Sequence, residues 1–366
     1  MTGQCIAVIA LQRDNRRTAR EKLVMTKAPA FRGRLFSRSV PDYGEATCAM
    51  TSNLPAMMKA AVADKAGPPD VIHITSVPVP QLTDGHVIIA LDYAGVGSWD
   101  AEQRSGNWGA VKPGTILGVD GSGTVAAVGD GVTHLRVGER VYSYSYAEPS
   151  GAFHAEYVSV PADRAERVPE QLDQKVAGAM PCVALTAHAG LRVLKAKRGE
   201  LLLVFGASGG VGSLAVWLAA NAMGATVVGT GRPETHEYLR TLGAAHAIDP
   251  RSPRRDAVIK ELAPNGFDAV LATANGDDLP AFLSHLRSDA PIAYPNGVEP
   301  EIRIKGHPSL PFDGGMSRED FERLNVAIGT RSMPLSVEVF PLDLVVDAHR
   351  RIEQGRVEGK IVLRIR

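Results

Sequence analysis

The stretch Leu201–Ala215, LLLVFGASGGVGSLA, decides how the rest of the chain is interpreted. Five apolar residues come first, a glycine-rich turn follows at once, and a good helix-forming sequence comes after the turn. A buried strand, a tight turn and a helix in this order begin a dinucleotide-binding βαβ unit. The alternative is a glycine-rich turn in an ordinary α/β protein. A second apolar stretch at Ala225–Gly229, where a crossover would return, favours the dinucleotide site.

The glycines of this turn follow the spacing Gly206-x-x-Gly209-x-x-Gly212. Gly206 lets the chain leave the strand sharply, and Gly209 and Gly210 let the backbone approach a pyrophosphate without a Cβ in the way. Gly212 lets the helix pack close to the strand. The start of the helix offers free N–H groups and a positive dipole end to the phosphates. This spacing is not a strict GxGxxG, so the assignment depends on the flanking strand and helix.

Length and composition give no indication of a nucleic-acid or membrane partner. The 366 residues are enough for two domains with their own cores. Lys and Arg together number 40, as do Asp and Glu, so the zero net charge gives no reason to expect a nucleic-acid or membrane partner. No apolar run approaches a bilayer span, and the three cysteines form no CxxC pair. We therefore expect a soluble, cytoplasmic protein without disulfides.

Residues 1–56 differ from the rest of the chain. Their apolar periodicity is poor, and few acids balance a set of arginines: Arg13, Arg16, Arg17, Arg20, Arg32, Arg34 and Arg38. One interpretation is an Arg-rich targeting segment. The others are a disordered tail, or a translation start placed upstream of a true start at Met57 or Met58. We favour these plainer interpretations and treat residues 1–56 as an extension outside the fold.

From Met58 the pattern becomes regular. Short apolar stretches with Gly and Pro between them predict a β-rich, barrel-like domain, with strands at 58–63, 73–77, 86–96, 118–129, 132–142 and 155–160. Residues 172–195 are helical in pattern. After Ala225 strands (226–230, 247–248, 269–272 and 292–294) alternate with helices (233–242, 253–262 and 278–287), which predicts a parallel doubly wound sheet. A helix at 318–329 and a strand at 360–365 are expected to return to the first domain.

Together these segments resemble the medium-chain dehydrogenase/reductase superfamily, and most nearly its zinc-independent, zeta-crystallin-like quinone oxidoreductases. The resemblance runs from Met58 to Arg366. It is carried by AGVGSWDAEQRSG (94–106), LGVDGSGTVAAVG (117–129), VGERVY (137–142), GAFHAEYVSVP (151–161), MPCVALTAHAGL (180–191), FGASGGVGSLA (205–215) and GKIVL (359–363). It implies a GroES-like β-rich catalytic domain (57–180 and 309–366) split around a Rossmann NADP-binding domain (181–308).

The resemblance also bears on metal. In the zinc alcohol dehydrogenases a Cys, a His-Glu pair and a later Cys hold the catalytic zinc. Gly97, Val119 and Asp120 stand at the first three matching positions, and Gly and Val have no ligating atom. The histidines at 134, 154 and 188 are isolated in the sequence, and a lone histidine is more often a satisfied or surface residue than a ligand. We expect no metal.

Without zinc there is no Lewis acid to lower the pKa of an alcohol, so alcohol oxidation is disfavoured. Our hypothesis is an NADPH-dependent reductase of quinones or α,β-unsaturated carbonyls, in which the cofactor carries the hydride chemistry. The alternatives are a zinc-free carbonyl or enoyl-thioester reductase of the same superfamily, and a non-catalytic NADPH-binding protein. The partner is a small-molecule substrate. Family members pair through the edge of the Rossmann sheet, which implies a homodimer.

Three residues are candidates for the reacting site, all through the resemblance. Trp99 and Asp100 stand where the family places residues that flank nicotinamide and substrate. Thr186 would lie near the nicotinamide or carry a hydroxyl on the helix surface, and we weigh the two equally. Trp99 would stack on a flat substrate or belong to the core. Asp100 would relay a proton or shape a turn, and we favour the turn. Gly97-Ser98 replaces the Asn-Pro that is common in the family, so an amide is missing here.

The end of the second Rossmann strand predicts the cofactor. NAD-binding domains carry an acid there that binds the ribose hydroxyls. Gly231 occupies this position and leaves room for a 2′-phosphate. Arg232 can offer the phosphate a planar fork of N–H donors, and His236 can add one more donor when it is protonated. Glu234 opposes a phosphate if it points inward. The alternative is that Arg232 is a solvated surface residue and that selectivity between the two cofactors is weak; we favour NADPH. Besides the turn glycines, the further cofactor contacts implied are Ser208, Val211, Thr230, Asn275, Asn296 and Gly297.

Overall fold

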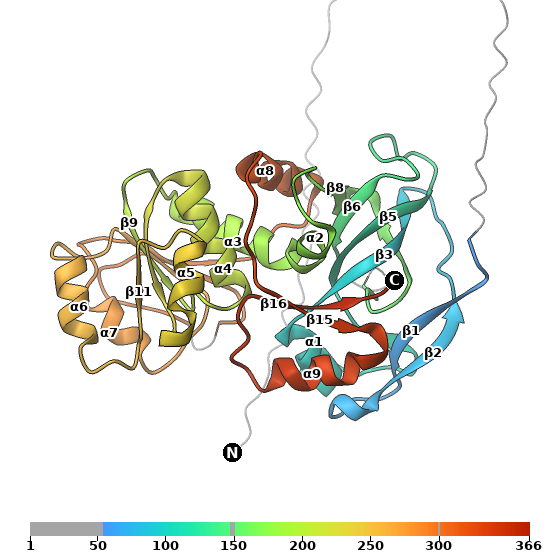
Figure 1. Cartoon of the computed structure of the whole chain (residues 1–366), viewed down its shortest axis with the longest axis horizontal. Helices are drawn as coiled ribbons and strands as arrows, with labels where there is room; N and C mark the ends of the chain where they lie inside the picture. Colours follow the sequence, from blue (N-terminus) through green and yellow to red (C-terminus); the bar gives the residue numbers. More distant parts are fainter. Residues whose placement is uncertain (1–53, 147–150, 299–300) are drawn as a thin grey trace, which may run out of the picture. The chain divides into compact units, whose positions relative to one another are not determined.

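The computed structural model describes residues 54–146, 151–298 and 301–366, coloured by position along the chain in Figure 1. The predicted N-terminal extension falls outside this part of the chain, apart from its last residues. Met57 is already the first residue of strand β1 (Met57–Ala63). Across the described ranges, no helix has both the length and the apolar character needed to cross a membrane.

The β-rich domain is built from two sheets. The larger runs β15-β16-β3-β5-β6-β8, with β7 also paired to β3. Its strands are β3 (His86–Val96), β5 (Asp120–Val128), β6 (Arg140–Tyr144), β7 (Tyr157–Pro161), β8 (Ala165–Arg167), β15 (Val337–Pro341) and β16 (Lys360–Arg364). The smaller sheet, β2-β1-β4, adds β2 (Ile72–Pro78) and β4 (Thr115–Ile116). Because β16 pairs antiparallel with β3, with Ile361 opposite Val96, the C-terminal segment completes this domain.

The second domain is a six-stranded sheet in the order β11-β10-β9-β12-β13-β14, in which every pairing is parallel. Its strands are β9 (Leu201–Phe205), β10 (Thr226–Thr230), β11 (His246–Ile248), β12 (Ala269–Ala272), β13 (Ile292–Pro295) and β14 (Ser309–Phe312). The chain winds outward from β9 in one direction and from β12 in the other. The predicted doubly wound sheet is confirmed, and its switch point lies between β9 and β12, where such folds bind ligands.

Helices cover the parallel sheet on both faces. They are α3 (Pro181–Leu194), α4 (Gly210–Trp217, continued by the π-helical turn η3, Leu218–Met223), α5 (His236–Thr241), α6 (Arg255–Leu262) and α7 (Leu279–Leu283). A further helix, α8 (Arg318–Ile328), packs on α3, η3 and β8. Along β9, Leu202 and Val204 join the core cluster that contains Leu214 of α4. Leu203 joins the other cluster, with Phe282 of α7. Burial on both faces explains why this strand is a continuous apolar run.

The remaining helices and 3₁₀ turns lie mainly in and around the β-rich domain. They are α1 (Ser98–Ser105), α2 (Gln174–Ala179), α9 (Val345–Glu353) and the 3₁₀ turns η1 (Pro69–Val71), η2 (Ala162–Arg164), η4 (Pro233–Thr235) and η5 (Leu342–Leu344). In Figure 1, α9 lies beside α1, next to β15 and β16. Both α1 and the turn between α9 and β16 reach the pocket described below.

Three predictions about the elements need correction. The helix expected over 172–195 is two helices, because Pro181 is tolerated only in a first turn and begins α3. The return to the first domain was predicted at residue 309, but β14 pairs with β13 and is the sixth strand of the Rossmann sheet. The strand expected at 132–142 starts only at Arg140, after a series of turns.

Candidate active site

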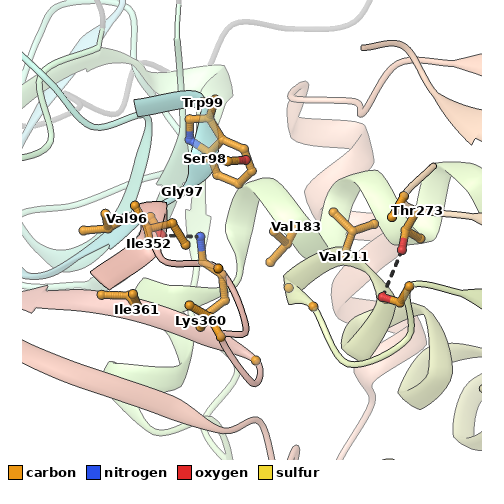
Figure 2. A pocket seen from close by; sticks show the side chains of 18 residues that line it. Val96, Gly97, Ser98, Trp99, Val183, Val211, Thr273, Ile352, Lys360 and Ile361 are labelled. Atoms are coloured by element: carbon orange, nitrogen blue, oxygen red, sulfur yellow. Dashed lines mark hydrogen bonds between the residues drawn. The ribbon is translucent and has the colours of Figure 1, made fainter. Parts of the chain in front are cut away.

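A cavity of about 250 Å³ lies at the glycine-rich turn. Its walls come from segments far apart in the sequence: the junction of β3 and α1, the start of α3, the turn after β9, the end of β12, and the turn between α9 and β16 (Figure 2). The lining residues are Val96, Gly97, Ser98, Trp99, Val183, Gly206, Gly209, Gly210, Val211, Gly212, Thr273, Ala274, Ile352, Gly355, Val357, Gly359, Lys360 and Ile361.

The glycine-rich turn forms one wall, and its geometry requires glycine. Gly206 has φ +80°, which L side chains rarely adopt. A Cβ on Gly212 would lie 2.1 Å from the carbonyl oxygen of Gly206, so the first turn of α4 packs directly on the end of β9. The hydroxyl of Thr230, predicted to contact cofactor, accepts a hydrogen bond from the Gly206 amide at 2.9 Å and so fixes the turn.

The opposite wall holds Trp99 directly over Gly97. A Cβ added to Gly97 would lie 2.3 Å from two atoms of the Trp99 ring, closer than real Cβ contacts. The position of the Trp99 ring therefore requires glycine at position 97. The indole Nε1 is buried and has no acceptor among the described residues. Trp99, predicted as a site residue, lines the cavity.

Asp100 is placed differently from the proton relay considered above. It is fully buried and does not line the cavity. One carboxylate oxygen accepts a hydrogen bond from the Gly97 amide at 2.7 Å, and the other accepts one from the Gly118 amide at 3.1 Å. Burial raises the pKa of Asp100 to about 6, and these hydrogen bonds and Lys360 oppose the rise. Its contacts are those of a residue that shapes the start of α1.

Thr186 also lies away from the cavity lining. Its hydroxyl donates to the carbonyl of Cys182, one turn earlier in α3, at 2.8 Å. A Cβ on Gly314 would lie 2.5 Å from the same hydroxyl oxygen, so the loop after β14 packs against it. The helix α3 reaches the cavity through Val183 instead.

Lys360, the first residue of β16, lines the cavity and was missed by the sequence reasoning. It is only 4% exposed. Its Nζ donates to the Val96 carbonyl at 3.3 Å and lies 4.7 Å from the centroid of the Trp99 ring. A Cβ on Gly210 would lie 3.0 Å from Cδ of Lys360, so the stem packs on the turn. The available signal was a lysine at the head of the apolar run KIVL, since lysine is seldom buried without a partner.

A second buried carboxylate acts electrostatically on Lys360. Asp120 accepts a hydrogen bond from the Cys182 amide at 3.0 Å through one oxygen, and its other oxygen has no partner within the described chain. Burial raises the pKa of Asp120 to about 6, and the charge of Lys360 is the largest effect that opposes this rise. His154 is buried next to this group, and burial lowers its pKa to about 4, so it is neutral at pH 7.

The residues predicted to read the cofactor's ribose lie beyond the cavity. Arg232, 37% exposed at its side chain, is 3.9 Å from Glu234. A ring nitrogen of His236 lies 3.0 Å from the Gly231 carbonyl and donates to it. A Cβ on Gly231 would meet the Thr235 hydroxyl oxygen at 2.5 Å, so part of the space expected there is filled.

The other predicted cofactor contacts sit at the same edge of the sheet. Asn275 follows β12 and is exposed, and Asn296 and Gly297 follow β13 and are exposed. Ser208 lies within the turn, where its carbonyl accepts from the Gly359 amide at 3.0 Å. None of these four lines the cavity, whereas Val211 does. All follow the carboxyl ends of parallel strands, where open α/β sheets bind ligands.

The three histidines considered as metal ligands do not converge. His134 and His154 each have a ring nitrogen 3.0 Å from a backbone carbonyl, of Ala162 and Gly95 respectively. His188 lies in α3, and burial lowers its pKa. Over residues 54–146, 151–298 and 301–366 no group of three or more His, Cys, Asp or Glu side chains is arranged to hold a metal ion.

Comparison with known proteins agrees with this architecture. Residues 83–170 match the family model "Alcohol dehydrogenase GroES-like domain", and residues 210–300 match "Zinc-binding dehydrogenase". The quinone oxidoreductase of Sus scrofa is 30% identical over 328 residues, which are 84% of this chain and 98% of that protein. A probable quinone oxidoreductase of Leishmania amazonensis is 33% identical over 209 residues, but that match spans only 56% of this chain and 59% of the relative.

Solved structures show the same likeness. The quinone oxidoreductase of Coxiella burnetii superposes with a TM-score of 0.72 at 26% identity, covering 85% of this chain and 100% of that one. A mycobacterial protein complexed with NADPH gives a TM-score of 0.73 at 27% identity, with 84% and 100% covered. The chain thus belongs to the medium-chain dehydrogenase/reductase superfamily, in its quinone oxidoreductase branch, and is an oxidoreductase that uses a nicotinamide cofactor on a small-molecule substrate.

Proposed function

We propose that this protein is a zinc-independent reductase of quinones or α,β-unsaturated carbonyls that uses NADPH. The observation that carries the proposal is the packing of the Trp99 indole on Gly97, because position 97 matches the first zinc ligand of the alcohol dehydrogenases. A Cβ at this position would lie 2.3 Å from the indole ring. No ligating side chain fits there while Trp99 keeps its place.

The neighbouring positions support the same conclusion. Val119 is a buried apolar residue, and one oxygen of Asp120 is already engaged by the Cys182 amide. A set of ligands for a catalytic zinc needs at least three donors directed at one point. Quinones and enones are electrophiles that accept a hydride without a Lewis acid, so they suit a site of this composition.

The chain's own residues would position the reactants. The turn at Gly209 and Gly210 begins α4, whose free N–H groups suit a pyrophosphate. Val96, Trp99 and Val183 give the cavity apolar walls that exclude water from the reacting atoms. When bound, a reduced nicotinamide supplies the hydride.

Support for the NADP form comes from two sources. One relative is named an NADPH-dependent alkenal/one oxidoreductase (Arabidopsis thaliana, 29% identity, 85% of this chain and 81% of that one), and the mycobacterial structure contains NADPH. In this chain the end of β10 carries Arg232 and no acid at position 231. We further propose a cytoplasmic homodimer that pairs through β14, one of the two edge strands of the parallel sheet.

The test is a substrate panel with purified protein. We expect NADPH to be oxidised by quinones or enones, with no loss of rate after a zinc chelator and no stoichiometric zinc in elemental analysis. Alcohol oxidation that a chelator abolishes and zinc restores would overturn the proposal. So would a panel of quinones and enones in which none oxidises NADPH. Light scattering of the same preparation reports the oligomeric state.

A further inference from the structure

Lys360 is the only ionisable residue among the described residues that line the cavity. The rest are glycines and apolar side chains, with the hydroxyls of Ser98 and Thr273. A lysine ammonium has three N–H donors, and taking it out of water is costly unless they find acceptors. Within the described chain Nζ has one hydrogen bond, to the Val96 carbonyl at 3.3 Å. Two donors of a buried cation are therefore available to a ligand.

The carboxylates near Lys360 do not take up these donors. Neither Asp100 nor Asp120 forms an ion pair with Nζ within 4 Å, although both act on it electrostatically. Three of their four oxygens accept hydrogen bonds from the amides of Gly97, Gly118 and Cys182. The carboxylates therefore balance the charge of Lys360 from a distance and leave its N–H groups free.

The ammonium lies at the wall of the cavity opposite the glycine-rich turn. The stem of Lys360 packs on Gly210, but its head extends to Val96 and the Trp99 ring (Figure 2). Gly210 marks the phosphate end of the cavity, since it begins α4. Val96 and Trp99 belong to the opposite wall. The charge is thus displaced from the glycine-rich turn toward the wall formed by Val96 and Trp99.

On the basis of the function proposed above, we infer that the Lys360 ammonium is an oxyanion-binding group that holds the substrate's carbonyl oxygen. Hydride addition to the β-carbon of an enone forms a C–H bond, breaks the C=C π bond, and leaves the electron pair on that oxygen as an enolate. Reduction of a quinone likewise leaves a hydroquinone anion. Lys360 stabilises this charge until water supplies the proton. Removing one such donor from an oxyanion site costs about 10²–10³ in rate.

The first experiment separates substrate from phosphate binding. Lys360→Met keeps the length and loses the charge, Lys360→Arg keeps the charge, and Lys197→Met removes an exposed lysine as the control. Cofactor affinity is measured by nicotinamide fluorescence, and the hydride-transfer rate by single turnover at saturating NADPH. We expect Lys360→Met to slow transfer about 100-fold or more, with the cofactor Kd almost unchanged. Lys360→Arg should retain much of the rate. A large rise in cofactor Kd with an unchanged transfer rate would assign Lys360 to phosphate and overturn the inference.

The second experiment needs no turnover. A phenol resembles the hydroquinone product, and 4-nitrophenol changes colour when it ionises. In the presence of NADP⁺, wild-type protein and Lys197→Met should lower the apparent pKa of bound 4-nitrophenol, whereas Lys360→Met should not. An equal shift in all three proteins would contradict the inference. If the wild type reduces no quinone or enone yet binds the phenolate through Lys360, the proposed function fails while the oxyanion site stands. Melting curves verify that each variant is folded, and Lys360→Gln, which also removes the charge, replaces Lys360→Met in both assays if Lys360→Met is not.

Discussion

Gly97 and Trp99 form a pair whose energetic coupling can be measured. In Gly97→Ala the new Cβ would lie 2.3 Å from two ring atoms of Trp99, so the indole or the backbone must move. The backbone itself accepts alanine, since φ at this position is −129°. Overpacking of this kind costs about 1–3 kcal/mol of unfolding free energy. Trp99→Ala removes the clash together with the indole, so the alanine at position 97 should cost little in the double variant.

Urea unfolding of the wild type, the two single variants and the double variant completes the cycle. We expect an interaction energy of about 1–3 kcal/mol, because residues in direct contact are not additive. A matched control is Gly138→Ala in place of Gly97→Ala, since a Cβ at Gly138 has no heavy atom within 4 Å, although its positive φ adds strain of its own. That strain should be independent of Trp99. Additive effects of Gly97→Ala and Trp99→Ala would refute the packing on which the zinc-independent proposal depends.

Three further variants test other parts of the site. Gly212→Ala would place a Cβ 2.1 Å from a backbone oxygen, and we expect at least a tenfold rise in cofactor Kd by fluorescence titration. An unchanged Kd would show that the glycine-rich turn can shift to accommodate the methyl group. Arg232→Ala should raise the KM for NADPH far more than that for NADH, whereas equal effects would show that Arg232 does not read the 2′-phosphate. Burial raises the pKa of Asp120 to about 6 from 3.8, so the folded state binds the proton more tightly and wild-type stability should fall as pH rises from about 4 to 6. Asp120→Asn should reduce this fall, which is measured by urea unfolding at several pH values. If the unfolding free energy of the variant depends on pH as steeply as that of the wild type, Asp120 is not the group responsible.

Much of the fold could be predicted because its signals are local. The run Leu201–Phe205 is apolar at every position since both faces of β9 are buried, and the glycine turn must follow it at once. β14 was missed for the opposite reason. The strand has only four residues, is only partly buried and contains Pro311. Its pairing with β13 is therefore the observation that identifies it as a strand.

The site was less accessible to prediction, because its contacts join distant segments. Trp99 was assigned to it by resemblance and lines the cavity, while Asp100, its neighbour, is turned into the protein. A one-residue step along a helix changes the direction of a side chain by 100°. Sequence spacing alone does not show which of two neighbouring residues faces a cavity. Lys360 could not be assigned to the site from the sequence, because it is the pairing of β16 with β3 that brings it to the cavity.

The same pairing has a consequence for biosynthesis. Lys360 contacts Val96 across 264 residues of sequence, and the whole Rossmann domain lies between them. On a ribosome, β3 would therefore wait with an open edge until β16 emerges, long after the parallel sheet can fold. A nascent chain that stops before residue 360 would carry the glycine-rich turn and Trp99 but would lack the Lys360 ammonium between them. Nicotinamide binding and oxidoreductase activity should thus appear at different times during synthesis, with activity last.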